Sequence, residues 1–96
     1  MDSAELRSFA EDRDIIVIDG KLRNEQKSIS ISDRGQCAIV VDPKKITTSA
    51  EETVIMAHEL GHCETGAFYN ERTLELRSRM EFRADKWAIK KLVTED

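Results

Sequence analysis

Residues 26–62, QKSISISDRGQCAIVVDPKKITTSAEETVIMAHELGH, decide the fold of this chain. Their first half predicts a β-hairpin. Ile29 and Ile31 alternate with serines, which is typical of a strand with one wet face. The tripeptide DRG (33–35) has the composition of a turn, and residues 37–41 form a second apolar strand.

The second half of this stretch predicts a helix. Pro43, the only proline in the chain, ends the strand section. Ser49 fits the N-cap position, and Glu52 three residues later completes the pattern of a capping box. The helix is expected to run to about Cys63. A hairpin followed directly by a helix favours a mixed α and β architecture.

The flanking sequence predicts three further elements. Ser3 can cap a short N-terminal helix, and residues 15–18 (IIVI) form a continuous β-branched run, as expected for a strand buried on both faces. A last amphipathic helix is expected over residues 73–93. The chain has no internal repeat or linker. The order of elements therefore predicts one α+β domain over residues 1–96, with a three-stranded, mainly antiparallel sheet packed on helices.

Composition excludes several classes of protein. The 96 residues carry 15 basic and 19 acidic side chains, a net charge of −4, so direct binding to nucleic acid is not expected. No apolar run approaches the roughly 20 residues that span a bilayer, and the N-terminal stretch lacks the pattern of a signal peptide. The cytoplasm is the expected location, with no membrane contact. In that reducing compartment, Cys37 and Cys63 are expected to be free thiols.

Both histidines of the chain lie in the sequence HELGH. Positions four apart share one face of a helix, so His58 and His62 can hold one zinc ion through their imidazole nitrogens. Glu59 lies about 100° around the helix from His58, where it can act as general base on water. Zinc lowers the pKa of a bound water molecule, so a neighbouring glutamate can take its proton at neutral pH. For this reason the H-E-x-x-H spacing is a metalloprotease signature. The alternative is two histidines satisfied by ordinary hydrogen bonds.

A catalytic zinc needs a third protein ligand, and the last helix offers one. Glu81 lies near the middle of that helix, with Asp85 one turn later on the same face. Glu81 could complete the coordination while Asp85 accepts the N–H of a zinc-bound histidine. The alternative is that both are solvated charges paired with Arg77 or Lys86. If Glu81 is not the ligand, Glu64 and Glu71 are the next candidates.

The two motifs AHELGHCETGAFYN (57–70) and EFRADKWAIKKLV (81–93) together resemble those of the ImmA/IrrE family, small bacterial and phage metallo-endopeptidases. The resemblance extends over residues 14–93. It implies a zincin-like fold, in which the H-E-x-x-H helix and a C-terminal helix supply the ligands of Zn²⁺. Carried over by position, it makes His58, His62 and Glu81 the zinc ligands, Glu59 the general base and Asp85 the residue that orients the first histidine.

The resemblance also implies a substrate and a longer chain. It points to an endopeptidase that cleaves one regulatory protein, typically a helix-turn-helix transcriptional repressor of a phage or mobile element. Members of the family commonly continue into further helices. Because this chain stops at LVTED, we expect it to be a truncated or minimal member.

Two features are candidates for contacting a substrate. Tyr69, in the loop after the metal helix, could place its hydroxyl near an oxyanion; the alternative is a tyrosine that only packs. The first strand of the hairpin could be an exposed edge that pairs with an extended peptide. Its residues are Ser28, Ile29, Ser30, Ile31 and Ser32. Their alternation is equally what any half-buried strand shows.

Two other functions stay open. One is a regulator that uses zinc for stability and docks to a protein without cutting it. Glu59 counts against this reading, because a structural zinc needs no general base and normally has four protein ligands. The other is a metal-free helical domain, which metal analysis would separate from both.

Overall fold

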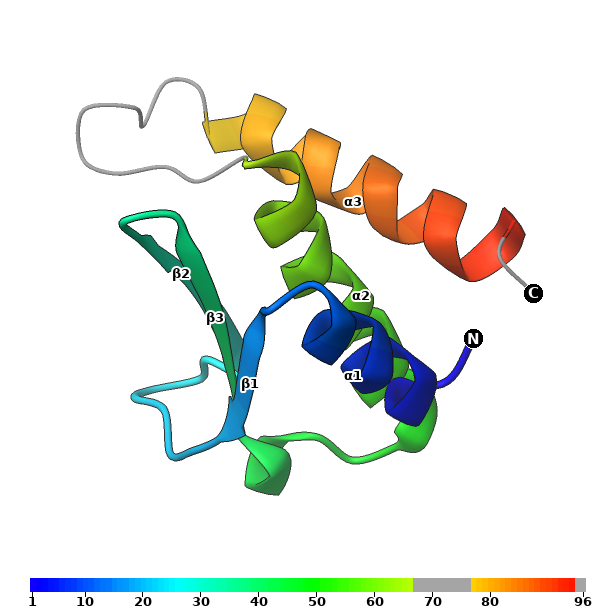
Figure 1. Cartoon of the computed structure of the whole chain (residues 1–96). Coiled ribbons are helices and arrows are strands. Elements are labelled where there is room, and N and C mark those ends of the chain that lie inside the picture. Colours follow the sequence, from blue (N-terminus) through cyan, green and yellow to red (C-terminus); the bar gives the residue numbers. More distant parts are fainter. Residues whose placement is uncertain (67–76, 95–96) are drawn as a thin grey trace.

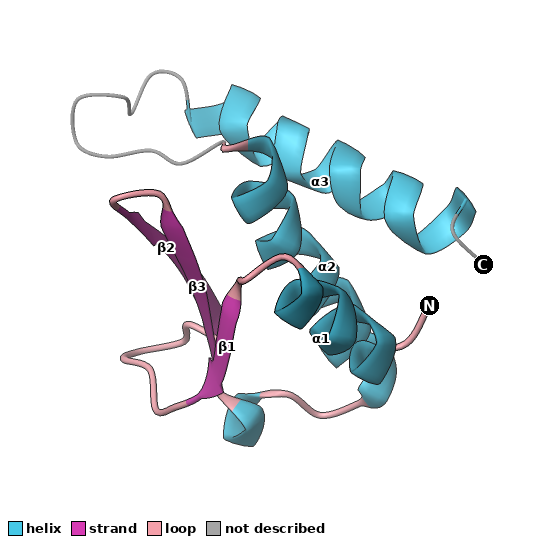
Figure 2. Ribbon diagram, in the orientation of Figure 1, coloured by secondary structure: helices cyan, strands magenta, loops and turns pink. Residues whose placement is uncertain are grey.

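The computed structural model describes residues 1–66 and 77–94 and has an α+β architecture (Figures 1 and 2). The elements are α1 (Ser3–Asp12), β1 (Ile16–Asp19), β2 (Ser28–Asp33), β3 (Gln36–Val41), a 3₁₀ turn η1 (Pro43–Lys45), α2 (Ser49–Thr65) and α3 (Arg77–Thr94). The start expected for the last helix, residue 73, lies outside the described residues. No helix in the described part of the chain has the length and apolar character needed to cross a membrane.

The sheet is mixed, with strand order β1-β3-β2. β2 and β3 form the predicted antiparallel hairpin, but β1 runs parallel to β3. The expectation of a mainly antiparallel sheet was therefore wrong for one of the two pairings. The chain leaves β1, crosses to the far edge to form β2, and returns through the hairpin into the centre. β2 is consequently an edge strand of the sheet.

The register of the hairpin decides which side chains face the helices. Ser28 pairs with Val41 and Ser30 with Ile39, and both apolar partners are almost fully buried. Directly paired residues project on the same face of a sheet, so the serines of β2 lie on the helix side. Ile31 points the other way and is 49% exposed. A wet serine face was expected, and the structure reverses it.

One face of the sheet is covered by α1 and α2, and α3 packs on the far side of α2 (Figure 1). This places α2 between the sheet and α3. The core lies in these two interfaces. Its fully buried larger side chains are Leu6, Ile39, Val41, Met56 and Leu60. Trp87 of α3 packs near Phe9 of α1, with ring centroids 5.8 Å apart.

The other face of the sheet is not covered by any described element (Figure 2). Ile16 and Ile18 are 49% and 51% exposed, whereas Ile15, which precedes the strand, is 9% exposed. The expectation of a strand buried on both faces was wrong for β1. A β-branched run predicts strand conformation, but the number of layers around the strand depends on the rest of the fold.

The N-cap residues of α1 and α2 each lie one position before the serine that was expected to cap the helix. Asp2 caps α1 and forms a capping box with Glu5. Thr48 caps α2 by accepting a hydrogen bond from the Glu51 N–H at 3.0 Å. Ser3 and Ser49, the expected caps, are instead the first helical residues. Each lies next to another residue with a capping side chain, so composition alone does not choose between them.

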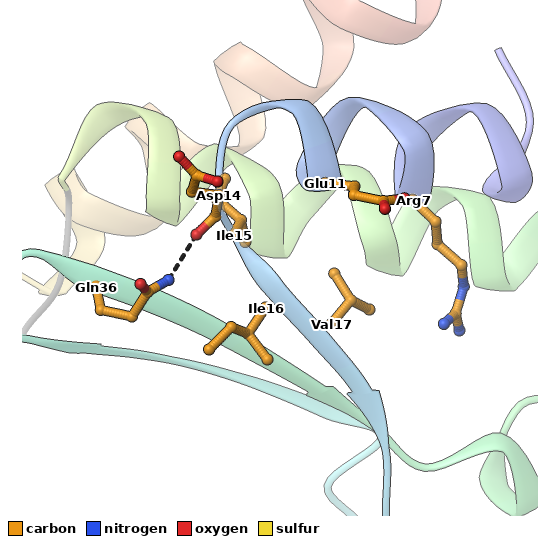
Figure 3. Close-up of a pocket in the computed structure, with 7 residues that line it drawn as sticks. All are labelled: Arg7, Glu11, Asp14, Ile15, Ile16, Val17 and Gln36. Atoms are coloured by element: carbon orange, nitrogen blue, oxygen red, sulfur yellow. Dashed lines mark hydrogen bonds between the residues drawn. The ribbon is translucent and has the colours of Figure 1, made fainter.

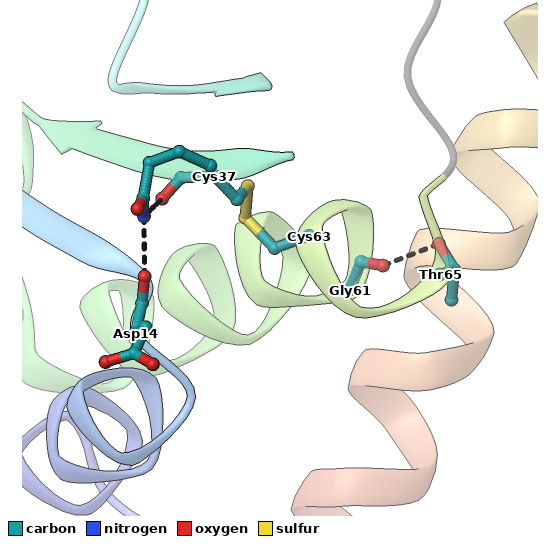
Figure 4. The surroundings of a disulfide bond; sticks show 6 residues. Asp14, Cys37, Gly61, Cys63 and Thr65 are labelled. Atoms are coloured by element: carbon teal, nitrogen blue, oxygen red, sulfur yellow. Dashed lines mark hydrogen bonds between the residues drawn. A yellow bond between two sulfur atoms is a disulfide. The ribbon is translucent and has the colours of Figure 1, made fainter. Parts of the chain in front are cut away.

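Cys37 and Cys63 form a disulfide between β3 and α2 (Figure 4). The expectation of two free thiols was therefore wrong. It rested on an assumed compartment and not on geometry. The cysteines are 26 residues apart in sequence, but packing of α2 on the sheet brings their Cα atoms to 5.8 Å, a normal disulfide separation.

Candidate metal centre

His58 and His62 lie one turn apart on α2, as the sequence HELGH predicts for a helix. Their rings meet edge to face, with centroids 4.8 Å apart. The two Nε2 atoms are 3.2 Å apart. His62 is almost fully buried, with 5% exposed, whereas His58 is partly exposed. His62 therefore lies in the interior of the protein, and His58 lies at the solvent-exposed edge of the same site.

Glu81 of α3 brings its carboxylate to both imidazoles. Its Oε2 lies 3.0 Å from Nε2 of His58, and its Oε1 lies 3.2 Å from Nε2 of His62. One ligand atom from each of the three residues falls within 4.8 Å of the others, so this group could hold a metal ion. The three residues predicted to be ligands converge from two helices. Their coordination of an ion stays a prediction.

The spacing of these atoms is of the order that a small tetrahedral cation needs. Zinc binds histidine nitrogen and carboxylate oxygen at about 2.0–2.2 Å, so neighbouring ligand atoms of a tetrahedral site are roughly 3.3–3.6 Å apart. The two Nε2 atoms are 3.2 Å apart, and the Glu81 contacts of 3.0 and 3.2 Å are made by different oxygens of its carboxylate. One ligand atom taken from each residue lies within 4.8 Å of the others. Two imidazoles and one carboxylate also form a ligand set that zinc uses in catalytic sites.

Asp85 fixes the orientation and tautomer of His58. Its Oδ1 lies 2.6 Å from Nδ1 of His58. A carboxylate accepts, so the proton is assigned to Nδ1, and the lone pair of Nε2 points at Glu81. Two acceptors then face each other at 3.0 Å, which is unfavourable unless a cation or a shared proton lies between them. A proton satisfies one such pair at a time, whereas a metal ion could be held by both Nε2 atoms and the carboxylate together.

Gly61 allows α3 to approach close enough for Glu81 to reach the histidines. A Cβ at position 61 would overlap the backbone carbonyl oxygen of Ala84 and lie 2.9 Å from its Cα. Ala84 is fully buried in this crossing. The glycine costs a mid-helix position about 1 kcal/mol of helix propensity. Its place in the contact explains why that cost is tolerated.

Glu59 lies on a different side of α2 from the histidines. Its side chain faces β2, where its Oε2 accepts a hydrogen bond of 2.5 Å from the Ser28 hydroxyl. The residue is only 6% exposed. A buried carboxylate needs a hydrogen-bond partner, and Ser28 supplies one. The serine was singled out in the sequence only as part of an edge strand. Knowing which serine meets Glu59 required the register of the hairpin.

The structure also shows the partners of the other acidic residues considered from the sequence. Glu81 and Asp85 face His58, and Lys86 forms no ion pair with either carboxylate among the described residues; the Arg77 side chain lies outside them. Glu64, the first alternative ligand, forms an ion pair with Arg13 at 3.2 Å.

Tyr69 and Glu71 lie outside the described residues, so their predicted roles stay predictions. Residues 28–32 do form an edge strand, but the pairing of that edge with a peptide also stays a prediction.

A groove of about 600 Å³ lies elsewhere, between α1 and the sheet (Figure 3). Arg7, Glu11 and Val17 line it, and at one end the Gln36 side chain donates a hydrogen bond to the carbonyl oxygen of Asp14. His58, His62 and Glu81 do not border this groove. The chemistry-bearing residues therefore gather at the α2–α3 crossing and at the α2–β2 interface.

Comparison of the chain with protein-family models, with curated proteins and with solved structures finds no match.

Proposed function

We propose that this chain is a zinc-dependent endopeptidase with a zincin-like active site. The observation that supports it best is the convergence of His58, His62 and Glu81, with the buried Glu59 carboxylate on the same helix. A structural zinc site would normally be closed by a fourth protein ligand, and among the described residues no fourth ligand joins this group. Zinc bound here would polarise a carbonyl group and lower the pKa of a water molecule.

The residues of the chain would then divide the work. His58, His62 and Glu81 would hold the ion, and Asp85 would keep the Nε2 lone pair of His58 directed at it. Glu59 would accept a proton from the attacking water as the oxygen bonds to the scissile carbonyl carbon. It would deliver that proton to the leaving amine as the C–N bond breaks, which leaves a free carboxyl and a free amino terminus.

We also propose that the substrate is held as an extended strand on the free edge of β2. This edge lies next to α2, because Ser28 at the start of β2 contacts Glu59. Unpaired backbone N–H and C=O groups of an edge strand can pair with a peptide in extended conformation. The resemblance of the motifs supports a helix-turn-helix transcriptional repressor of a phage or mobile element as the protein that is cut.

The experiment compares Glu59→Gln with the parent chain and with Glu64→Gln, a matched change on the same helix. Each protein is loaded with zinc and incubated with a helix-turn-helix repressor from the same genome, and products are identified by mass spectrometry. We expect Glu59→Gln to bind one zinc per chain and to lose cleavage, while Glu64→Gln cleaves like the parent. Equal cleavage by Glu59→Gln and the parent would refute the general-base role.

A regulator that binds zinc but cuts nothing is the second candidate. It would show one zinc per chain and repressor binding in the parent, without products.

The location of the protein is tested separately. We propose the cytoplasm, although disulfides persist mainly in oxidising compartments. Alkylation of the protein in intact cells, followed by mass spectrometry, reports whether Cys37 and Cys63 are bonded there.

A further inference from the structure

The edge strand and the proposed general base are joined by one short hydrogen bond. Ser28 donates to Glu59 at 2.5 Å, and among the described residues this is the hydrogen bond that the Glu59 side chain makes. The carboxylate is 6% exposed, so water has little access to replace the serine. A buried carboxylate held by one hydroxyl depends on that hydroxyl for its orientation.

The position of the Ser28 hydroxyl is set by the sheet. Ser28 pairs with Val41, which is 1% exposed, and this register turns both side chains towards the helices. Ser30 has the same orientation one pair further along the strand, opposite the fully buried Ile39. Its hydroxyl makes no hydrogen bond to the described residues. The two serines thus share a strand and a face, and differ in their contact with Glu59.

We infer that Ser28 is a positioning residue, which orients the Glu59 carboxylate and links it to the strand that would receive the substrate. This inference rests on the proposed function. An extended peptide pairing with β2 would restrain the backbone of Ser28. Through the hydroxyl, it would also restrain Glu59. The base would then be held most firmly when a polypeptide lies along the strand, which favours extended polypeptides over small amides as substrates.

The test uses a probe that needs both the metal and Glu59 and does not require turnover. Acetohydroxamate binds a metal ion through two oxygens and carries a proton that a neighbouring carboxylate can accept. The chain is loaded with Co²⁺, whose visible absorption reports the ligands around the ion. Titration with acetohydroxamate is then followed through that absorption in the parent and in variants.

We expect Ser28→Ala to weaken acetohydroxamate binding by about tenfold, because Glu59 loses the hydrogen bond that holds its buried carboxylate in place. Its Co²⁺ dissociation constant and unliganded cobalt spectrum should match those of the parent. Ser30→Ala, the matched control, should leave both dissociation constants unchanged. A purely structural hydrogen bond would lower thermal stability without this selective loss.

A second pair of variants keeps the test decisive if Ser28→Ala does not fold. Threonine and valine have similar shapes and both suit a strand, but only threonine has a hydroxyl. We expect Ser28→Thr to bind acetohydroxamate within about twofold of the parent, and Ser28→Val to bind it about tenfold more weakly. Equal binding by Ser28→Val and Ser28→Thr would overturn the positioning role and leave the metal site intact. A parent chain that takes up no Co²⁺ would instead refute the proposed function, and with it this inference.

Discussion

Two polar clusters in this molecule are built on opposite principles. One joins Asp42 and Lys45 at the end of β3, and its donors match its acceptors. The other joins His58, His62 and Glu81 where α2 crosses α3, and when the Nδ1–H of His58 donates to Asp85, the Nε2 lone pair of His58 faces the Glu81 carboxylate. The first cluster is complete as a piece of structure. The second would be stabilised by a shared proton or by a cation held among its atoms.

The Asp42–Lys45 cluster shows what a self-satisfied group looks like. Asp42 is 3% exposed and accepts hydrogen bonds from the N–H groups of Leu22 and Lys44 at 3.0 and 3.2 Å. The Lys45 ammonium lies 3.6 Å from the same carboxylate. It also donates to the carbonyl oxygens of Leu22, Asn24 and Gln26. These contacts fix the connection between β1 and β2, so the cluster has no need of a ligand.

The largest effect is expected from Glu81→Ala, which removes the only carboxylate of the proposed ligand group. Loss of a direct ligand should weaken zinc binding by several orders of magnitude, and the thermal stabilisation that zinc gives should disappear with it. Competition against a chromophoric chelator measures the dissociation constant.

Asp85→Asn provides a comparison for the loss of zinc affinity in Glu81→Ala. It keeps all three ligands and should weaken zinc binding by only about 10–100-fold. If Glu81→Ala binds zinc as tightly as the parent, the carboxylate ligand must be sought at Glu64 or Glu71.

Gly61→Ala should disturb the histidine cluster through packing alone. The new methyl group would collide with the Ala84 backbone, which cannot rotate away, and α3 would have to move. We expect a loss of about 1–3 kcal/mol in the free energy of unfolding, despite the better helix propensity of alanine. Zinc affinity should fall with it, because Glu81 moves with α3.

The control for this change is Gly20→Ala, where the methyl group would meet a side-chain atom, Cγ1 of Val40, at 3.2 Å. Urea unfolding and zinc titration of both variants provide the measurements. A Gly61→Ala protein as stable as the parent would show that α2 and α3 do not approach this closely at Gly61.

Lys45→Met tests the other cluster. It leaves the nearly buried Asp42 without its ammonium partner and removes the donor that contacts three carbonyl groups. We expect the free energy of unfolding to fall by about 1–3 kcal/mol, with zinc affinity unchanged. Lys44→Met is the matched control, since the Lys44 side chain is exposed and the cluster uses only its backbone N–H. Altered zinc affinity in Lys45→Met would mean that the two clusters are coupled.

The smallest effect is a pH dependence of stability from Asp42. The hydrogen bond from the Leu22 N–H, with further help from Lys44 and Lys45, holds the pKa of this carboxyl below its ordinary value of 3.8. The unfolded chain therefore binds the proton more readily, and the stabilisation is fully present above about pH 4. It is lost as pH falls through the lower pKa of the folded protein.

Asp42→Asn removes the titrating carboxyl group and, with it, this pH-dependent stabilisation. Its stability deficit relative to the parent, measured by urea unfolding at pH 7 and pH 3, should shrink at the lower pH. A deficit that stays constant or grows would contradict the sign of the shift.

The comparison also indicates what the sequence can and cannot predict. The hairpin, the helix carrying HELGH and the α+β class follow from local patterns, because periodicity and turn composition act over a few residues. The pairing of β1 with β3, the Cys37–Cys63 bond and the inward serines of β2 depend on how distant segments meet. The alternation of Ile and Ser could be read in either orientation, and only the register with Ile39 and Val41 decides it.

The candidate ligands could be named from the sequence for a different reason. His58 and His62 belong to one helical turn, so their spacing is local information. Glu81 and Asp85 also form one turn of a helix, and a motif resemblance linked the two turns. No such signal connects Ser28 to Glu59 or Lys45 to the carbonyl groups it contacts. These contacts follow from tertiary packing, which a single sequence does not encode in any short pattern.

The most direct test of the central claim is an anomalous-scattering map at the zinc edge, from crystals grown with zinc at neutral pH. We predict one peak within about 2.0–2.2 Å of Nε2 of His58, Nε2 of His62 and a carboxylate oxygen of Glu81. A peak held by other residues, or no peak between α2 and α3 in zinc-saturated crystals, would contradict the account.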